Sequence, residues 1–495
     1  MKFISTRSKN YEGVSSAYAI KTGLCNDGGL FMPESIPQLT EEELLALLSE
    51  SYEVRAAKIL SKFLTDYTYE ELLSDTKEAY SYEKFGESAA PVSDLTGGMY
   101  MLELWHGPTC AFKDMALQIM PRLFSRALEK CDEKRTALIL VATSGDTGKA
   151  VLEGYRDVPG TKIKVFYPTG GVSRVQKLQM QTQEGKNVSV EAIVGNFDDA
   201  QNGVKRIFSD KKIAKELDDA GVFLSSANSI NWGRLVPQIV YYISAYCDMV
   251  KSGAISLGEK IDICVPTGNF GNIFAAYIAK LMGLPLATLV CASNKNNVLT
   301  DFLECGTYDR NRPFHQTISP SMDILISSNL ERLLYTVAGP EKTAGYMREL
   351  AENGKYTLDS EDFAKIKESF VGYYTDEELT KKTILEAYNE RKALIDTHTA
   401  VAVSAASRYM SAHGAERKML TVSTASPYKF ASDVYLALTD TNAKSDTDAL
   451  SQLEELTGVP TPSPLASLTS KPVIHDSIID RSDMEKVVKE FASLS

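Results

Sequence analysis

The sequence predicts an α/β protein in which mostly parallel sheets are covered by helices. Five apolar runs with strand character alternate with helical patterns through the middle of the chain. Alternation of this kind produces right-handed βαβ units and a parallel sheet. The polar, glycine-containing loops follow such strands and precede helices, which is where ligands of these sheets bind. The 495 residues, 44% apolar and 24% charged, suit a soluble enzyme of about three domains.

The first ninety residues form a candidate domain of their own. Turn signals at Asn26 to Gly29 precede a capping box, in which Thr40 opens a helix and Glu43 lies three residues later. A break from Ala90 to Gly98 ends the helical pattern. We therefore expect an N-terminal domain over residues 1–92, a catalytic core over 93–460 and a C-terminal tail over 461–495.

The core carries the alternating pattern. Its strands are expected at residues 137–142, 162–167, 188–194, 222–224, 261–265 and 419–422. Helices are expected at residues 149–156, 173–183, 198–220 and 234–252. We expect a smaller lobe over about 136–235, a charged helical insertion over about 300–395, and a last amphipathic helix near 484–491.

Lys113 and a distant glycine loop carry the most informative chemistry. Lys113 lies where a turn gives way to a helical pattern, and its amine can form a Schiff base. Gly268, Asn269, Phe270, Gly271 and Asn272 lie between a strand and a helix, where backbone N–H groups can hold a phosphate. A cofactor with an aldehyde and a phosphate needs both features, and pyridoxal phosphate is such a cofactor. The alternatives are an ordinary tight turn and a solvated surface lysine.

Three further segments place polar groups at strand ends. Ser144, Asp146 and Thr147 suit a substrate carboxylate or phosphate, or they only cap the following helix. Arg234, in a segment with Asn231, can clamp a phosphate, or it is a surface arginine beside a capping turn. Thr424 offers a hydroxyl after the strand at 419–422, unless it is a solvated turn residue.

Several function classes are disfavoured. The net charge of −12 argues against nucleic-acid and anionic-membrane partners. The five histidines show no metal-ligand spacing, so we expect no metal site. Neither the P-loop spacing nor a dinucleotide fingerprint is present, which argues against a nicotinamide oxidoreductase. Seven scattered cysteines and an opening segment without a secretory pattern predict a cytoplasmic protein, with no apolar run able to span a membrane.

Taken together, the motifs resemble the threonine synthase family of pyridoxal-phosphate enzymes, over nearly the whole chain. The family has the fold type II architecture, similar to tryptophan synthase β: two parallel-sheet α/β lobes, here with an additional N-terminal domain. The motifs that carry the resemblance, besides the segments above, are Ser5-Thr6-Arg7, Asp27 to Glu34, Phe112-Lys113-Asp114, Ser321 to Ile324, Ser328 to Arg332, His398 to Val401 and Ser423-Thr424-Ala425.

The resemblance implies a role for each matching position. Lys113 would bind the cofactor covalently, the loop from Gly268 to Asn272 would hold its phosphate, and Thr424 would face its pyridine nitrogen. Ser144, Asp146 and Thr147 would border the cofactor and the substrate carboxylate. Asn231 and Arg234 would approach the substrate, with Arg234 at its phosphate.

The family's reaction converts O-phospho-L-homoserine and water into L-threonine and phosphate. Two departures lie beside expected site positions: Ser426 stands where the family often has histidine, and Thr397 where it often has proline. The alternatives are a phospho-lyase or a serine or threonine dehydratase of the same fold, and a catalytically silent binding homologue. We expect a monomer or a homodimer.

Overall fold

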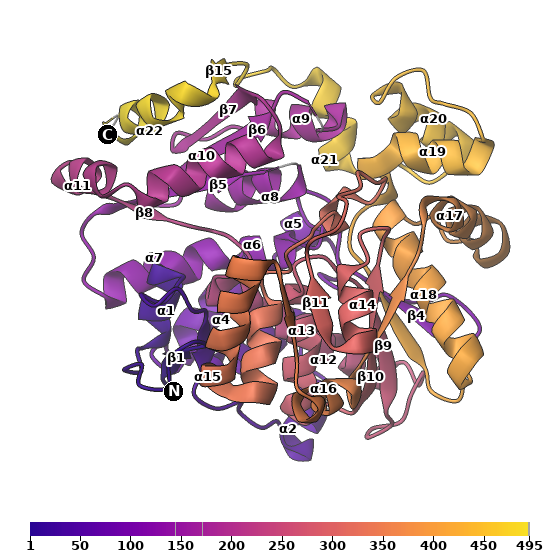
Figure 1. Cartoon of the computed structure of the whole chain (residues 1–495). Coiled ribbons are helices and arrows are strands. Elements are labelled where there is room, and N and C mark those ends of the chain that lie inside the picture. Colours follow the sequence, from indigo (N-terminus) through magenta and orange to yellow (C-terminus); the bar gives the residue numbers. More distant parts are fainter. Residues whose placement is uncertain (144, 171, 494–495) are drawn as a thin grey trace.

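The computed structural model describes residues 1–143, 145–170 and 172–493. Two main sheets, each in its own lobe, organise the chain (Figure 1). The larger sheet has the strand order β13-β10-β9-β14-β4-β3, and the smaller has the order β15-β7-β6-β5-β8. All neighbouring strands of the two sheets are parallel except the pair of β3 with β4, which confirms the predicted α/β class.

The large lobe is built from strands that are far apart in the chain. Its strands are β3 (Val92–Asp94), β4 (Met99–Glu103), β9 (Ile261–Pro266), β10 (Leu286–Ser293), β13 (Phe370–Tyr374) and β14 (Met419–Ser423). Its helices include α6 (Asp114–Leu117), α7 (Met120–Lys130), α12 (Trp232–Lys251), α13 (Gly271–Leu281), α14 (Val298–Cys305), α15 (Leu330–Asn353), α16 (Ser360–Lys367), α17 (Glu377–Arg391) and α18 (Thr397–His413).

The small lobe contains the alternating pattern of the sequence. Its strands are β5 (Thr136–Ala142), β6 (Thr161–Pro168), β7 (Val188–Val194), β8 (Val222–Ser225) and β15 (Ile478–Asp480). Its helices are α8 (Asp146–Tyr155), α9 (Arg174–Gln181), α10 (Phe197–Ser209), α11 (Lys211–Asp219) and α22 (Met484–Ser493). The end of the chain returns to this lobe, because β15 pairs with β7 and α22 lies along the lobe (Figure 1).

The N-terminal segment packs against the large lobe. Its elements are β1 (Phe3–Ser5), α1 (Ser16–Thr22), β2 (Phe31–Pro33), α2 (Glu41–Leu47), α3 (Tyr52–Phe63), α4 (Tyr69–Ala79) and α5 (Tyr82–Phe85). The capping box predicted at Thr40 and Glu43 is present at the start of α2. Helix α12, buried on almost every side, lies between α3 of this segment and α13 of the large lobe.

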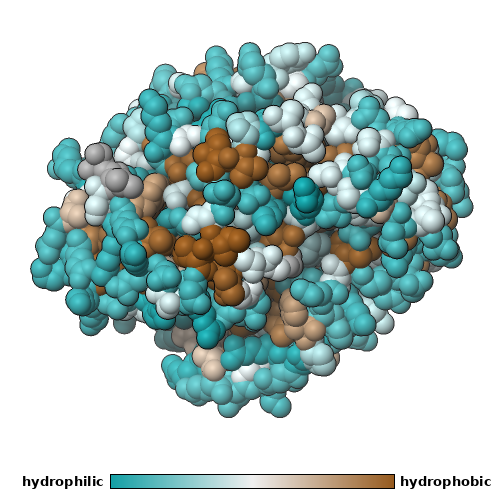
Figure 2. Space-filling view, turned by 90° about the horizontal axis from the view of Figure 1, so that it is seen from above, coloured by the Kyte–Doolittle hydropathy of each residue, from teal (hydrophilic) through white to brown (hydrophobic). Residues whose placement is uncertain are grey.

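The remaining elements lie outside these three groups, and the last of them contacts α10 and α22 of the small lobe. They are β11 (Thr307–Asp309), η1 (Pro320–Met322), β12 (Lys355–Thr357), η2 (Pro427–Phe430), α19 (Ala431–Thr439), α20 (Asp448–Thr457), α21 (Ser463–Ala466), η3 (Leu468–Ser470) and η4 (Arg481–Asp483). Figure 2, looking down on the small lobe, shows small apolar patches in a mostly hydrophilic face; exposed Val194, Val473, Ile474 and Ile478 come from segments at this end.

The structure differs from the expected elements in several places, among them strands β3 and β4 of the large sheet, which were not predicted. The helix expected over 198–220 is two helices, because the Asp210 side chain accepts hydrogen bonds from the backbone N–H groups of Lys212 and Ile213 and so starts α11. Strand β10 was not predicted. The segment 300–395, expected to be helical, also contributes the edge strand β13 to the large sheet. The domain boundaries at 92 and 460 stay a prediction.

Candidate active site

The carboxyl ends of β9 and β14 and the start of α6 bring the predicted site residues together. Thr424 directly follows β14, and its carbonyl oxygen accepts a hydrogen bond of 2.8 Å from the backbone N–H of Phe112, the neighbour of Lys113. Lys113 lies at the N-cap of α6. Ser321, from η1, lies between Lys113 and the glycine loop, since its hydroxyl is 3.5 Å from the Lys113 amine and its carbonyl borders Gly268.

The Lys113 amine is buried and only loosely bonded. Its Nζ atom lies 3.5 Å from the Ser321 Oγ and 3.6 Å from the Asp146 Oδ2. Burial lowers the pKa of Lys113, the Asp146 carboxylate opposes this shift, and the charges of Lys429 and Arg234 add to it. The neutral amine, which is the nucleophilic form, is therefore reached at a lower pH than in a solvated lysine.

Asp146, at the start of α8, is held as a carboxylate by several donors. Its Oδ1 accepts from the Lys429 Nζ at 2.8 Å and from the Gln176 Nε2 at 3.0 Å. Its Oδ2 accepts from the Ser321 Oγ at 3.3 Å. Burial raises the pKa of Asp146, but the charges of Lys429 and Lys113 outweigh that effect, so the pKa is lowered and the group stays ionised.

Ser321 is positioned by a buried histidine. The His398 Nε2 lies 3.1 Å from the Ser321 backbone N–H and must accept its hydrogen, so Nδ1 carries the ring proton and donates to the Asp396 Oδ2 at 2.8 Å. Asp396 also caps α18 by accepting from the backbone N–H groups of His398 and Thr399. The Ser321 loop, the tautomer of His398 and the start of α18 are therefore fixed by one network.

The loop from Gly268 to Asn272 fits a phosphate group. A Cβ atom on Gly268 would lie 2.6 Å from the Ser321 carbonyl oxygen, so only glycine allows this close approach. Phe270 takes a left-handed conformation, with φ of 63°, as the loop enters α13. Among the residues that the structure describes, the backbone N–H groups of Gly268, Asn269 and Phe270 donate to no protein acceptor. The first N–H groups of α13 add to this set, as at any helix start.

The side chain of Asn272 is aligned from behind the loop. Its Oδ1 accepts hydrogen bonds from the hydroxyls of Tyr241 and Tyr242, on the buried helix α12. Its Nδ2 is buried and has no partner within the described part of the chain. The loop therefore has unused donors on the backbone and on a side chain, as a site for an anion requires.

Arg234 is a buried cation without a carboxylate. Its Nη1 donates to the Ala227 carbonyl oxygen at 2.8 Å, and its Nε has no partner among the described residues. Burial lowers the pKa of Arg234 to about 10. A buried guanidinium with unused donors suits a phosphate or a carboxylate of a ligand.

The other predicted substrate residues are placed less directly. The Asn231 side chain caps α12 through the Gly233 N–H and donates to the Ile20 carbonyl oxygen at 2.9 Å, so its contact with a substrate stays a prediction. Thr147 lies half-buried in the first turn of α8. Ser144 lies outside the described residues.

Sequence reasoning missed the contacts of Lys429. It placed Ser321, His398 and Asn329 only in family motifs and gave them no role; the Asn329 Nδ2 donates to the Asn269 carbonyl oxygen in the glycine loop at 3.0 Å. Lys429 lies in η2, five residues after Thr424, and its side chain is fully buried. The sequence from Ser423 to Phe430 gives one indication of a site role for Lys429, namely a lysine close to the end of an apolar strand. Without the fold, the same pattern fits an ordinary surface lysine. The pairing of Lys429 with Asp146 joins segments that lie hundreds of residues apart, so no local pattern reports it.

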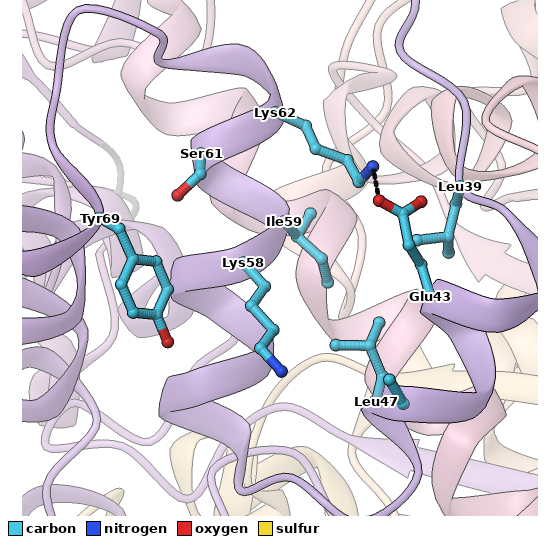
Figure 3. A pocket seen from close by; sticks show the side chains of 9 residues that line it. Leu39, Glu43, Leu47, Lys58, Ile59, Ser61, Lys62 and Tyr69 are labelled. Carbon is cyan, nitrogen blue, oxygen red and sulfur yellow. Dashed lines mark hydrogen bonds and ion pairs between the residues drawn. The ribbon is translucent and has the colours of Figure 1, made fainter.

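Other features of the described residues stand apart from this site. A surface pocket of about 420 Å³ lies between α2 and α3, with Leu39, Leu47 and Ile59 at its apolar base and an ion pair of Lys62 with Glu43 beside it (Figure 3). It contains none of the predicted site residues. Within the described ranges, no helix has the length and apolar character needed to cross a bilayer, and no cluster of three metal-ligating side chains is present.

Comparisons with known proteins identify the family of the chain. The family models described as "Threonine synthase N terminus", "Pyridoxal-phosphate dependent enzyme" and "Threonine synthase, C-terminal" match residues 2–80, 89–425 and 399–478. Threonine synthase of Pseudomonas aeruginosa is 38% identical, over 87% of this chain and 89% of that protein. Human threonine synthase-like 1 is also 38% identical, over 94% of this chain. The chain spans only 62% of that human protein and 65% of its Macaca fascicularis counterpart.

Solved structures extend the likeness to three dimensions. The pyridoxal-phosphate-bound threonine synthase of Brucella melitensis has a TM-score of 0.87 at 34% identity, covering 99% of both chains. The yeast enzyme has a TM-score of 0.88 at 34% identity, covering 99% of this chain and 97% of that one. Sequence and fold thus agree, and the chain belongs to the threonine synthase family of pyridoxal-phosphate-dependent enzymes.

Proposed function

We propose that the protein converts O-phospho-L-homoserine and water into L-threonine and phosphate. The observation that carries the proposal is a buried lysine, Lys113, whose pKa is lowered by burial and which lies near two separate groups suited to anions. One is the glycine loop with its free N–H groups, and the other is Arg234. The pairing fits a reaction in which cofactor and substrate each bring a phosphate.

The residues around the cofactor position fit pyridoxal phosphate. We infer that Lys113 binds it covalently, that the loop from Gly268 to Asn272 holds its phosphate and that the Thr424 hydroxyl faces its pyridine nitrogen. When bound, the cofactor withdraws electron density from the α-carbon of an amino-acid substrate. A threonine at the ring nitrogen does not supply the charge that an aspartate would.

The chain's own groups then have defined tasks. Lys113, released as a neutral amine, is the base that removes the α-proton of the substrate. Arg234 holds the γ-phosphate, which departs with the C–O bonding electrons after a β-proton is lost. A proton is returned to the γ-carbon, water then adds its hydroxyl at the β-carbon, and the α-carbon regains a proton, which completes threonine. Ser321, 3.5 Å from Nζ and 3.3 Å from the Asp146 Oδ2, is placed to keep the Lys113 amine oriented.

An assay of both products tests the proposal. Purified protein with pyridoxal phosphate and phosphohomoserine should release phosphate and threonine in equal amounts, and Lys113→Ala should lower the rate by at least about a thousandfold because base and covalent link are lost together. Borohydride reduction followed by mass spectrometry should place the cofactor on Lys113. Phosphate release with 2-oxobutyrate in place of threonine would instead identify a phospho-lyase, and no turnover with cofactor bound would identify a binding homologue.

We further infer that the protein works on a small molecule in the cytoplasm, as a monomer or homodimer. The cysteines of the chain are present as free thiols, in keeping with a reducing compartment.

A further inference from the structure

Two buried lysines face one carboxylate in the site. Among the described residues, Asp146 is the one carboxylate within ion-pair distance of Lys113 or of Lys429. Two further charged groups act here, the Arg234 guanidinium from α12 on Lys113 and the buried Asp114 carboxyl from α6 on Lys429. The neutral His398 ring from α18 is the other titratable group that acts on Asp146. Asp146 can therefore neutralise one ammonium group, and the second would remain an uncompensated buried charge.

The Lys429 amine is bonded as a complete ammonium. Its Nζ donates to the Asp146 Oδ1 at 2.8 Å, the Thr109 carbonyl oxygen at 3.0 Å and the Gln179 Oε1 at 3.2 Å. An ammonium has three N–H donors, so each of them has an acceptor. The Lys429 side chain has no solvent exposure. Loss of one proton would leave two N–H donors for three buried acceptors, so one acceptor would lose its hydrogen bond.

Lys113 is bonded in a different way. Its Nζ reaches the Asp146 Oδ2 at 3.6 Å and the Ser321 Oγ at 3.5 Å, both at the outer limit of a hydrogen bond. The Asp146 Oδ2 is shared with the Ser321 hydroxyl, which donates to it at 3.3 Å. Deprotonation therefore costs Lys113 fewer and weaker hydrogen bonds than it would cost Lys429.

We propose that Lys429 is a positioning residue. It pairs with the Asp146 carboxylate, so that Lys113, which lacks a close anionic partner, is the lysine that becomes neutral. The link also joins the lobes, because Asp146 starts α8 of the small lobe and Lys429 lies in η2 beside the large sheet. The chain thus selects which of two neighbouring lysines reacts with an aldehyde. The inference rests on the proposed role of Lys113 as the cofactor lysine.

The rate at which apoenzyme combines with pyridoxal phosphate, measured against pH, tests this idea. The reactive amine must be neutral, so the rate rises with pH and levels off above the pKa of Lys113. In Lys429→Gln, Asp146 has no other cation to pair with and turns to Lys113, so the midpoint should move up by about 1 to 3 pH units. The double variant Lys429→Gln with Asp146→Asn removes the pair as a unit and should return the midpoint to or below the wild-type value.

Two more variants keep the test decisive. Lys164→Gln removes another buried lysine, paired with Glu191 in the small lobe, and should leave the midpoint unchanged. Asp146→Asn alone should lower the midpoint, because Lys113 then faces only positive groups. This variant tests the same pairing if Lys429→Gln does not fold. An unmoved midpoint in Lys429→Gln, or no recovery in the double variant, would overturn the inference. An adduct found on a lysine other than Lys113 in the wild-type protein would instead overturn the proposed function.

Discussion

At the scale of single residues, the site depends on backbone approaches that only one amino acid allows. Gly268 lies against the Ser321 carbonyl oxygen, and that contact is with main chain, which cannot rotate away as a side chain would. The same carbonyl belongs to the loop that His398 holds through its ring. A change at Gly268 therefore acts on the phosphate loop and on the neighbour of Lys113 together.

We predict that Gly268→Ala weakens pyridoxal phosphate binding at least tenfold. The added Cβ would approach the Ser321 oxygen to 2.6 Å, so the loop must move and its N–H groups lose their common direction. Fluorescence titration of the apoenzyme measures the affinity. Gly345→Ala is the matched control, because no atom lies near that position in α15 and alanine favours a helix. Equal affinity of Gly268→Ala and wild type would contradict the placement of the cofactor phosphate.

At the scale of elements, the start of α15 supports the loop from Gly268 to Asn272. Both the backbone N–H and the Nδ2 of Asn329 donate to the Asn269 carbonyl oxygen at 3.0 Å. The Arg332 guanidinium, fully buried, donates to the Asn329 Oδ1 and to the carbonyl oxygens of Ile230 and Phe31. One helix end thus fixes the loop after β9 relative to α12 and β2.

We predict that Asn329→Ala lowers pyridoxal phosphate affinity by about five- to twentyfold, since one loop hydrogen bond is lost and Arg332 is left with an unused donor. The pH midpoint of cofactor association should stay where it is, because the charges around Lys113 are unchanged. Asn353→Ala, at the opposite end of α15, is the control and should behave as wild type. A shifted midpoint in Asn329→Ala would show that the loop and the Lys113 environment are not separable.

Element by element, the sequence predicts local features better than long-range ones. The strands at 188–194 and 419–422, the Thr40 cap and the loop after β9 follow from periodicity and turn chemistry, which act within a few residues. Strand β10 escaped prediction because its apolar run, from Leu286, reads equally well as a buried helix. The pairing of Lys429 with Asp146 depends on two lobes meeting, which no local signal encodes. Lys113 and the glycine loop therefore stay predictions of the sequence, and the contacts of Lys429, whose partners are distant in the chain, were missed.

At the scale of the whole molecule, the N-terminal segment is joined to the catalytic core by charge as well as by packing. Glu331, buried on α15, accepts two hydrogen bonds of 2.8 Å from Arg7 and one of 2.6 Å from the Thr6 hydroxyl. The next residue, Arg332, donates to the side chain of Asn329, which in turn bonds the loop from Gly268 to Asn272. The pair of Glu331 with Arg7 therefore connects the first strand of the chain to the elements of the site.

We predict that Arg7→Ala lowers the free energy of unfolding by about 2 kcal/mol, because it leaves the buried Glu331 carboxylate without its cation; a fully buried pair would cost more, but Arg7 retains contact with water. Urea unfolding measures the change. In Arg7→Ala with Glu331→Gln the loss should be smaller, since the unpaired charge is gone. Lys134→Ala, which breaks an exposed ion pair with Asp132, should leave the urea midpoint unchanged. If Arg7→Ala also unfolds at the wild-type midpoint, the N-terminal segment is held by apolar packing alone, and the charged link to α15 is incidental.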